Sequence, residues 1–255
     1  MSTDENSWPA PPEKLLVSHE SVHVWRAFLN STSVAERLIP LLNSVEIQRA
    51  ESFYFARDRT RYINGHGVLR DILSRYTDRA PQALRFDYAE YGKPYLAKGY
   101  GADGLRFNMS HSHEVGLYAV TLHREVGVDV EHMRADFARE EVAERFFSRA
   151  EVEALRTLPA HLRTDGFFNC WTRKEAYIKA IGEGLNFPLD QFTVSLEPGE
   201  TAMLLDVAGK PQEATRWSMQ QLFPQAGYAA ALAVEGVGWQ IERWGWTVQS
   251  RSRND

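Results

Sequence analysis

One segment of the sequence combines a carboxylate and an amine at a spacing that could support chemistry. Glu175 and Lys179 are four residues apart, so in a helix they lie side by side. The neighbouring stripe has helical period and is mostly apolar; it consists of Phe167, Trp171, Lys174, Ile178 and Ile181. Gly182 and Gly184, followed by Pro188, predict the end of this helix. A solvated surface ion pair would have the same spacing, so this pattern alone leaves both interpretations open.

A second acidic segment lies upstream, at residues 126–131. Valines alternate there with glycine and acids, which predicts a strand with Asp129 and Glu131 on the same face. Two carboxylates at this spacing repel each other, so either the face is in water or a cation lies between them. Just before this strand, residues 107–113 read Phe-Asn-Met-Ser-His-Ser-His and predict a polar turn that leads into an apolar strand at 115–122.

Taken together, the motifs form an ordered set. Asn-x-Ser-His-Ser at 108–112 is followed by Gly-Val-Asp-Val-Glu at 127–131 and by Trp-x-x-Lys-Glu-Ala-x-x-Lys-Ala-x-Gly-x-Gly-Leu at 171–185. This set resembles the 4′-phosphopantetheinyl transferases of the Sfp type. The resemblance covers roughly residues 20–235 and includes Tyr-Gly-Lys-Pro at 91–94. It implies an enzyme that transfers the 4′-phosphopantetheine group from coenzyme A to a serine of an apo carrier protein and releases 3′,5′-ADP.

The resemblance also implies roles for the acidic residues. Asp129, Glu131 and Glu175 would together bind Mg²⁺, a hard cation that prefers oxygen ligands and often keeps substrate phosphate in its coordination shell. Glu175 is in addition the best candidate for the general base, and the sequence leaves open whether it is base, ligand or both. Lys179 would neutralise charge on the leaving phosphate, and His111 would contact the pyrophosphate.

Coenzyme A would be held mainly by cationic and polar side chains. The candidates are Arg49, Arg61, Lys93, Ser110, His111 and Lys179. Among these, the family resemblance assigns Arg61 to the 3′-phosphate and places Lys93 near the nucleotide end. Glu46 departs from the family pattern, because some relatives have a lysine there. The phosphate clamp is therefore weaker than in those relatives, or Arg57 or Arg59 completes it.

The predicted elements run in the order strand, helices, strands, then helices and strands again. Strands are expected at residues 22–29, 84–88, 105–109, 115–122, 126–131, 192–196, 203–207, 217–222 and 228–234. No repeat is visible in residue identity, but this order permits two similar α+β halves. Two such halves with pseudo-twofold symmetry, and an active site in the cleft between them, are what the family resemblance implies.

With two such halves, the chain is predicted to have three parts. Residues 1–20 form an N-terminal arm, residues 21–133 the first α+β half, and residues 134–255 the second half with a C-terminal tail. Residues 1–14 of the arm, which include Pro9, Pro11 and Pro12, are expected to be disordered or loosely attached. Residues 239–246 are aromatic and alternating, and are either a late strand or a tail that crosses the body.

Short polar motifs predict where two helices begin. Asn43 with Glu46, and Ser148 with Glu151, have the spacing of capping boxes, in which each side chain bonds the other residue's backbone N–H. A longer helix is expected over residues 59–76, with its apolar side chains directed inward.

Composition excludes several classes of protein. The 255 residues are 44% hydrophobic, which is enough for a substantial core, and the net charge of −5 argues against general nucleic-acid binding. Cys170 is the only cysteine, so neither an internal disulfide nor a cysteine metal cluster can form. No apolar run approaches the roughly 20 residues that cross a bilayer, and the polar start has no signal-peptide core. A cytoplasmic protein without membrane or nucleic-acid partners is expected.

Two alternatives to the transferase are a non-catalytic coenzyme A or carrier-binding module and a Mg²⁺-dependent phosphohydrolase. The module would keep the phosphate-binding arginines but not need the three acids, all of which are present. The hydrolase would use water in place of serine, and no sequence feature excludes it. Because two halves in one chain would build the site internally, a monomer is expected.

Overall fold

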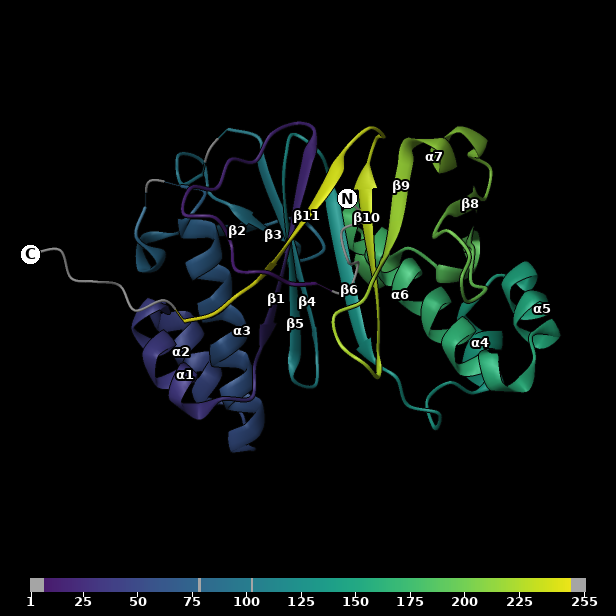
Figure 1. The fold of residues 1–255 in the computed structure, drawn as a ribbon, viewed down its shortest axis with the longest axis horizontal. Helices are drawn as coiled ribbons and strands as arrows, with labels where there is room; N and C mark the ends of the chain where they lie inside the picture. Colours follow the sequence, from purple (N-terminus) through teal and green to yellow (C-terminus); the bar gives the residue numbers. More distant parts are fainter. Residues whose placement is uncertain (1–6, 78, 102, 249–255) are drawn as a thin grey trace, which may run out of the picture.

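Two mainly antiparallel sheets lie next to each other at the centre of the molecule, and helices cover the outer side of each (Figure 1). The computed structural model describes residues 7–77, 79–101 and 103–248. Its mixture of helices and antiparallel strands confirms the predicted α+β class. Within these ranges no helix is both long enough and apolar enough to cross a membrane.

The first series of elements builds the left-hand side of Figure 1. Its members are β1 (Ser21–Phe28), α1 (Thr32–Leu38), α2 (Ser44–Glu51), α3 (Ala56–Ser74), β2 (Phe86–Tyr88), β3 (Pro94–Leu96), β4 (Leu105–Ser112) and β5 (Val115–Leu122). The long strands pair in the order β1-β5-β4, and β2 and β3 form a separate hairpin.

The second series repeats this order on the right-hand side of Figure 1, with one additional helix, α7 (Pro211–Arg216). Its members are β6 (Val126–His132), α4 (Glu140–Phe146), α5 (Arg149–Thr157), α6 (Arg163–Ile181), β7 (Phe192–Val194), β8 (Leu204–Val207), α7, β9 (Trp217–Leu222) and β10 (Tyr228–Glu235). The strand order β6-β10-β9 corresponds to β1-β5-β4. The two halves are therefore similar, as predicted. The second series begins at β6, and the division at residue 133 stays a prediction.

The chain returns to the first sheet at its end. β11 (Gln240–Gly245) pairs in parallel with β1, so residues 239–246 contain a strand, one of the two predicted alternatives. Residues 1–6 of the predicted arm lie outside the described part of the chain. Within the described part, Trp8 Nε1 donates to the carbonyl of Phe223, and the N–H of Gly245 donates to the carbonyl of Pro9. The arm thus contacts the second half and also β11, the strand that pairs with the first sheet.

Three apolar clusters hold these layers together. One lies beneath α6, and a second lies between α3 and the first sheet. The third joins the two sheets and is rich in valine, with Val24 of β1, Leu117 of β5, Val128 of β6 and Leu232 of β10 among its fully buried members. Because buried apolar residues of both sheets form this one cluster, the two halves form one packed body.

Local sequence signals account for the helix boundaries. Both capping boxes are present: Glu46 N–H donates to Asn43 Oδ1 at 2.9 Å, and Ser148 N–H donates to Glu151 Oε2 at 2.7 Å. α6 ends as predicted at Gly182, which has φ 77° and donates its N–H to the carbonyl of Ile178. A residue without a Cβ adopts this left-handed conformation at little cost.

The sequence-based boundary of β4 was wrong by three residues. The strand continues through Ser110, His111 and Ser112, which were expected to lie in a turn. They extend because each pairs with a residue at the start of β5. The turn is reduced to the two residues after Ser112, and His113 there has φ 51°.

Candidate active site

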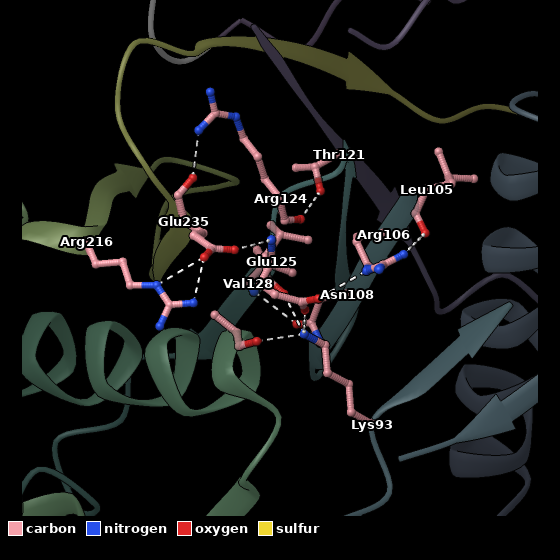
Figure 2. A network of polar contacts seen from close by, with 12 residues as sticks. Lys93, Leu105, Arg106, Asn108, Thr121, Arg124, Glu125, Val128, Arg216 and Glu235 are labelled. Carbon is pink, nitrogen blue, oxygen red and sulfur yellow. Dashed lines mark hydrogen bonds and ion pairs between the residues drawn. The ribbon is translucent and has the colours of Figure 1, made fainter. Parts of the chain in front are cut away.

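Alternate side chains of β4 attach this strand to β6 across the junction of the two sheets. The N–H of Val128 donates to Asn108 Oδ1 at 3.0 Å (Figure 2), and Ser110 Oγ donates to Asp129 Oδ1 at 2.8 Å. Asn108, Ser110 and Ser112 are two residues apart and therefore share one face of β4. This geometry explains the Asn-x-Ser-x-Ser spacing, and it brings polar residues of the first half to the acidic strand of the second.

Lys179 joins this cluster from α6. Its Nζ lies 2.5 Å from Asp129 Oδ1 and donates to Ser110 Oγ at 3.0 Å. Asp129 is 2% exposed, whereas the Lys179 side chain is 28% exposed. Burial alone would lower the pKa of Lys179, but the Asp129 carboxylate raises it above its ordinary value. The amine is therefore a permanent cation at the base of the site.

Glu131 lies on the same face of β6, held by Ser112. Ser112 Oγ donates to Glu131 Oε2 at 2.8 Å and accepts the N–H of His132 at 3.1 Å. Partial burial, together with the nearby charge of Asp129, raises the pKa of Glu131. Two predicted ligands of a cation thus share a face, as the alternation of the sequence indicated.

Glu175 faces these acids from α6, one helical turn before Lys179. Burial raises the pKa of Glu175 to about 7, and the charges of Asp129 and Glu131 act in the same direction, while Lys179 opposes them. A carboxylate with this pKa exchanges its proton near neutral pH. That property suits a general base.

Gly127 allows α6 to lie directly on β6. A Cβ atom at this position would be 2.0 Å from the carbonyl oxygen of Ala176 and 2.4 Å from the backbone nitrogen of Ala180. Both atoms belong to helix backbone, so no side-chain movement could relieve the overlap. The glycine of Gly-Val-Asp-Val-Glu is therefore what sets the short distance between the acids of β6 and the face of α6.

His111 projects from the opposite face of β4, toward α3. Its Cδ2 lies 3.6 Å from where a Cβ of Gly65 would be, so the ring is in van der Waals range of α3 at this glycine. Burial lowers the pKa of His111 below its ordinary value, and the nearby Lys179 and Arg61 of α3 act in the same direction. The Arg61 side chain is 22% exposed, and its buried Nε has no hydrogen-bond partner. Arg61 and His111 thus lie in one region, beside the acidic cluster.

The other two residues predicted to contact the nucleotide, Arg49 and Lys93, have surroundings that differ from those of Arg61. Arg49 is exposed, with its guanidinium 5.2 Å from the ring centre of Phe53. Lys93 already has three acceptors of its own: Glu125 and two backbone carbonyls. Glu46, the residue that departs from the family pattern, caps α2 and forms a buried ion pair with Arg70 at 2.7 Å. Its carboxylate therefore has a structural role.

Comparisons with known proteins identify the family of the chain. A model described as "4′-phosphopantetheinyl transferase, N-terminal" matches residues 24–123, and one described as "4′-phosphopantetheinyl transferase superfamily" matches residues 125–233. The 4′-phosphopantetheinyl transferase HetI of Nostoc sp. is 40% identical over 242 residues, which is 94% of this chain and 98% of the relative. The chain belongs to the 4′-phosphopantetheinyl transferase family. It is an enzyme of that family, as the sequence motifs predicted.

More distant members are also similar. The 4′-phosphopantetheinyl transferase Sfp of Bacillus subtilis is 31% identical over 177 residues, covering 69% of this chain and 76% of the relative. Among solved structures, the holo-[acyl-carrier-protein] synthase of Thermotoga maritima matches 44% of this chain and 62% of its own, with 25% identity and a TM-score of 0.36.

The acidic cluster of this transferase has the donor chemistry of a Mg²⁺ site. Asp129 Oδ2 is buried and has no hydrogen-bond partner, so an oxygen is free in a place where water does not solvate it. Burial raises the pKa values of Glu131 and Glu175, and the charge of Asp129 acts in the same direction, so a cation bound beside them would favour their ionised forms. In the described part of the chain, no three His, Cys, Asp or Glu side chains already converge as a set of metal ligands. The Mg²⁺ site stays a prediction.

Two features of the site were not predicted from the sequence. The roles of Asn108 and Ser112 in joining β4 to β6 could have been found, because their alternation with Ser110 is a strand signal. The ion pair between Lys179 and Asp129 could not, because its partners are 50 residues apart and on different elements. Only the topology brings them together.

Proposed function

We propose that this transferase moves the 4′-phosphopantetheine group of coenzyme A to a serine hydroxyl of an apo carrier protein. The serine oxygen bonds to the phosphorus that carries pantetheine, the bond to the other phosphate breaks, and 3′,5′-ADP leaves. The observation that supports this best is Glu175, a carboxylate with a pKa near 7 beside two further acids and a lysine. Such a carboxylate can accept the serine proton at neutral pH.

The charged residues around Glu175 could neutralise the negative charge of the phosphates during transfer. Lys179 lies at the base of the site, where its ammonium would neutralise the charge that develops on the leaving phosphate. Asp129, Glu131 and Glu175 would hold Mg²⁺, which when bound would neutralise pyrophosphate oxygens. Ser110 donates to Asp129 and holds it in place, and its hydroxyl would contact the same phosphates.

The nucleotide end of coenzyme A is assigned to the region between α3 and β4. Arg61 lies there beside His111, which would contact the adjoining pyrophosphate, and Arg49 is exposed on α2. The unpartnered Nε of Arg61 supports this assignment, because a buried guanidinium N–H without an acceptor costs free energy unless a ligand supplies one. A phosphate oxygen is a suitable acceptor, since charge-assisted hydrogen bonds to arginine are strong.

The proposed protein partner of this transferase is defined only by its class. The acceptor is a carrier-protein domain of a fatty-acid, polyketide or peptide synthase, and its serine must approach Glu175. One chain supplies α6 and both sheets, so a monomer is expected to hold the complete site. A cytoplasmic location is part of the same proposal.

A mass measurement tests the reaction. Purified protein is incubated with coenzyme A, Mg²⁺ and a panel of apo carrier proteins, and the products are weighed by mass spectrometry. We expect at least one carrier to gain one phosphopantetheine on its serine, with 3′,5′-ADP released in equal amount. Binding of coenzyme A without any product would indicate a binding module, and release of phosphopantetheine into solution would indicate a hydrolase.

Removing the Arg61 guanidinium should weaken the nucleotide selectively. Losing a hydrogen bond between charged groups costs about 1.5–3 kcal/mol, so Arg61→Ala should raise the Kd of coenzyme A by about 10–100-fold. The Kd of 3′-dephospho-coenzyme A should hardly change. Calorimetry with both ligands checks this, with Arg37→Ala as the control because Arg37 is an exposed arginine of α1. Equal weakening of both ligands would contradict the assignment to the 3′-phosphate.

A further inference from the structure

Lys93 uses all of its hydrogen-bond donors on protein acceptors. Its Nζ donates to Glu125 Oε2 at 2.8 Å, to the carbonyl of Ala180 at 2.7 Å and to the carbonyl of Val126 at 3.3 Å (Figure 2). A lysine ammonium has three donors, so none remains for a nucleotide. The side chain is 15% exposed, which fits a structural contact better than a surface one.

The three acceptors come from the elements that carry the site. Ala180 is the residue after Lys179 near the end of α6, and Val126 is the first residue of β6. The aliphatic part of Lys93 also packs on the end of the helix, because its Cδ is 3.3 Å from where a Cβ of Gly182 would be. A lysine that bonds a C-terminal carbonyl satisfies a group the helix leaves open and interacts favourably with the helix dipole.

Glu125 completes the arrangement. Its second oxygen, Oε1, accepts from Arg106 Nε of β4 at 3.0 Å, so one carboxylate links the turn before β6 to both Lys93 and β4 (Figure 2). The Arg106 side chain is 45% exposed, whereas Lys93 lies deeper. Lys93 is therefore the member of this network that reaches α6.

We propose that Lys93 is a positioning residue that fixes the C-terminal turn of α6 against the start of β6. Gly127 sets how close the helix lies to the strand, and Lys93 holds the end of the helix at that distance. Lys179 and Glu175 thereby keep their places beside Asp129. This inference rests on the proposed function and replaces, for Lys93, the nucleotide contact that the family resemblance implies.

The two roles predict different changes in the Lys93→Met variant, which keeps the length of the side chain but removes its donors. If Lys93 positions α6, the Kd of 3′,5′-ADP should stay within about twofold while the single-turnover transfer rate at saturating coenzyme A falls. A displacement of about 1 Å in a catalytic group can cost about 10²-fold, so a fall of about 10–100-fold is expected. Lys98→Met is the control, because Lys98 is an exposed lysine close to Lys93 in sequence.

Glu125→Ala supplies a second variant that leaves the lysine in place. It should also lower the transfer rate. In the double variant, which carries Lys93→Met and Glu125→Ala, the loss of activation free energy should be smaller than the sum of the two single losses, because both changes break one network. Hydrogen exchange followed by mass spectrometry gives a readout without activity. The amides of residues 178–182 should exchange faster in both variants than in the parent.

The outcomes separate the alternatives. A lower transfer rate with unchanged 3′,5′-ADP binding, non-additive effects and faster exchange at residues 178–182 support the positioning role. A tenfold or greater rise in the Kd of 3′,5′-ADP with a preserved rate would overturn it in favour of a nucleotide contact. Unchanged exchange in both variants, or strictly additive effects, would overturn it as well. If the parent protein transfers nothing, the proposed function fails, and the exchange data still decide the role of Lys93.

Discussion

An Asp129→Asn variant should fold normally and lose nearly all transfer. The amide keeps the size of the side chain and one oxygen for Ser110 and Lys179, so its NH₂ group takes the place of Asp129 Oδ2, which is buried and unpartnered. A cation would lose a charged ligand there. Removing one well-placed electrostatic group commonly costs about 10²–10³-fold in rate, and a loss of at least this size is expected.

Single-turnover transfer at saturating Mg²⁺ and coenzyme A checks this expectation. Circular dichroism should confirm the fold, because the Lys179 side chain is partly exposed and water can solvate it when its partner loses charge. Asp87→Asn is the matched control, since Asp87 is an exposed residue of β2. If the Asp129→Asn rate stayed within a few-fold of the parent, the assignment of Asp129 to the Mg²⁺ site would be wrong.

Much of the site was predictable because its parts carry local signals. The period of the apolar residues and the glycine at 182 defined α6, and the alternation at 126–131 placed Asp129 and Glu131 on one face. These patterns depend only on neighbours in sequence. The catalytic candidates Glu175 and Lys179 therefore could be located on their elements before any topology was known.

Contacts between distant segments were not predictable in the same way. Lys174 stood out as a charge within an apolar stripe, and the fold explains it: its Nζ lies 2.8 Å from Glu151 and donates to the carbonyls of Leu189 and Phe192. Likewise, the parallel pairing of β11 with β1 joins the end of the chain to its beginning. No periodicity records such pairings. They follow from the packing of the whole chain.

The position of Glu175 shows how function opposes stability here. Its folded pKa of about 7 is above the ordinary value of 4.5, because the protein buries the carboxylate beside Asp129 and Glu131. A raised pKa means that the folded state holds the proton more tightly than the unfolded state. The resulting contribution to stability is fully present below about pH 4.5 and is lost as the pH rises through about 7.

Glu175→Gln should accordingly stabilise the metal-free protein at alkaline pH. Glutamine imitates the protonated acid, so in the presence of EDTA the variant should have a higher Tm than the parent at pH 8, and the difference should disappear near pH 5. Glu153→Gln is the control, because Glu153 is an exposed residue of α5. If the variant and the parent had the same Tm at pH 8, ionised Glu175 would not destabilise the folded state, and this expectation would be wrong.

The same variant should lose the chemical step. General-base catalysis is worth about 10²–10⁴-fold, and Glu175→Gln should lower single-turnover transfer by that amount while coenzyme A binding survives in part. The parent rate should fall as the pH drops below the pKa of Glu175, and the residual rate of the variant should lack this dependence.

A Mg²⁺ titration of the Glu175→Gln variant separates the two proposed roles of Glu175, general base and Mg²⁺ ligand. An amide still offers one oxygen to a metal, so a residue that only binds Mg²⁺ predicts a rate that recovers toward the parent as Mg²⁺ rises. If Glu175 takes the serine proton, excess Mg²⁺ leaves the variant slow, because the lost group is the base and no metal concentration replaces it.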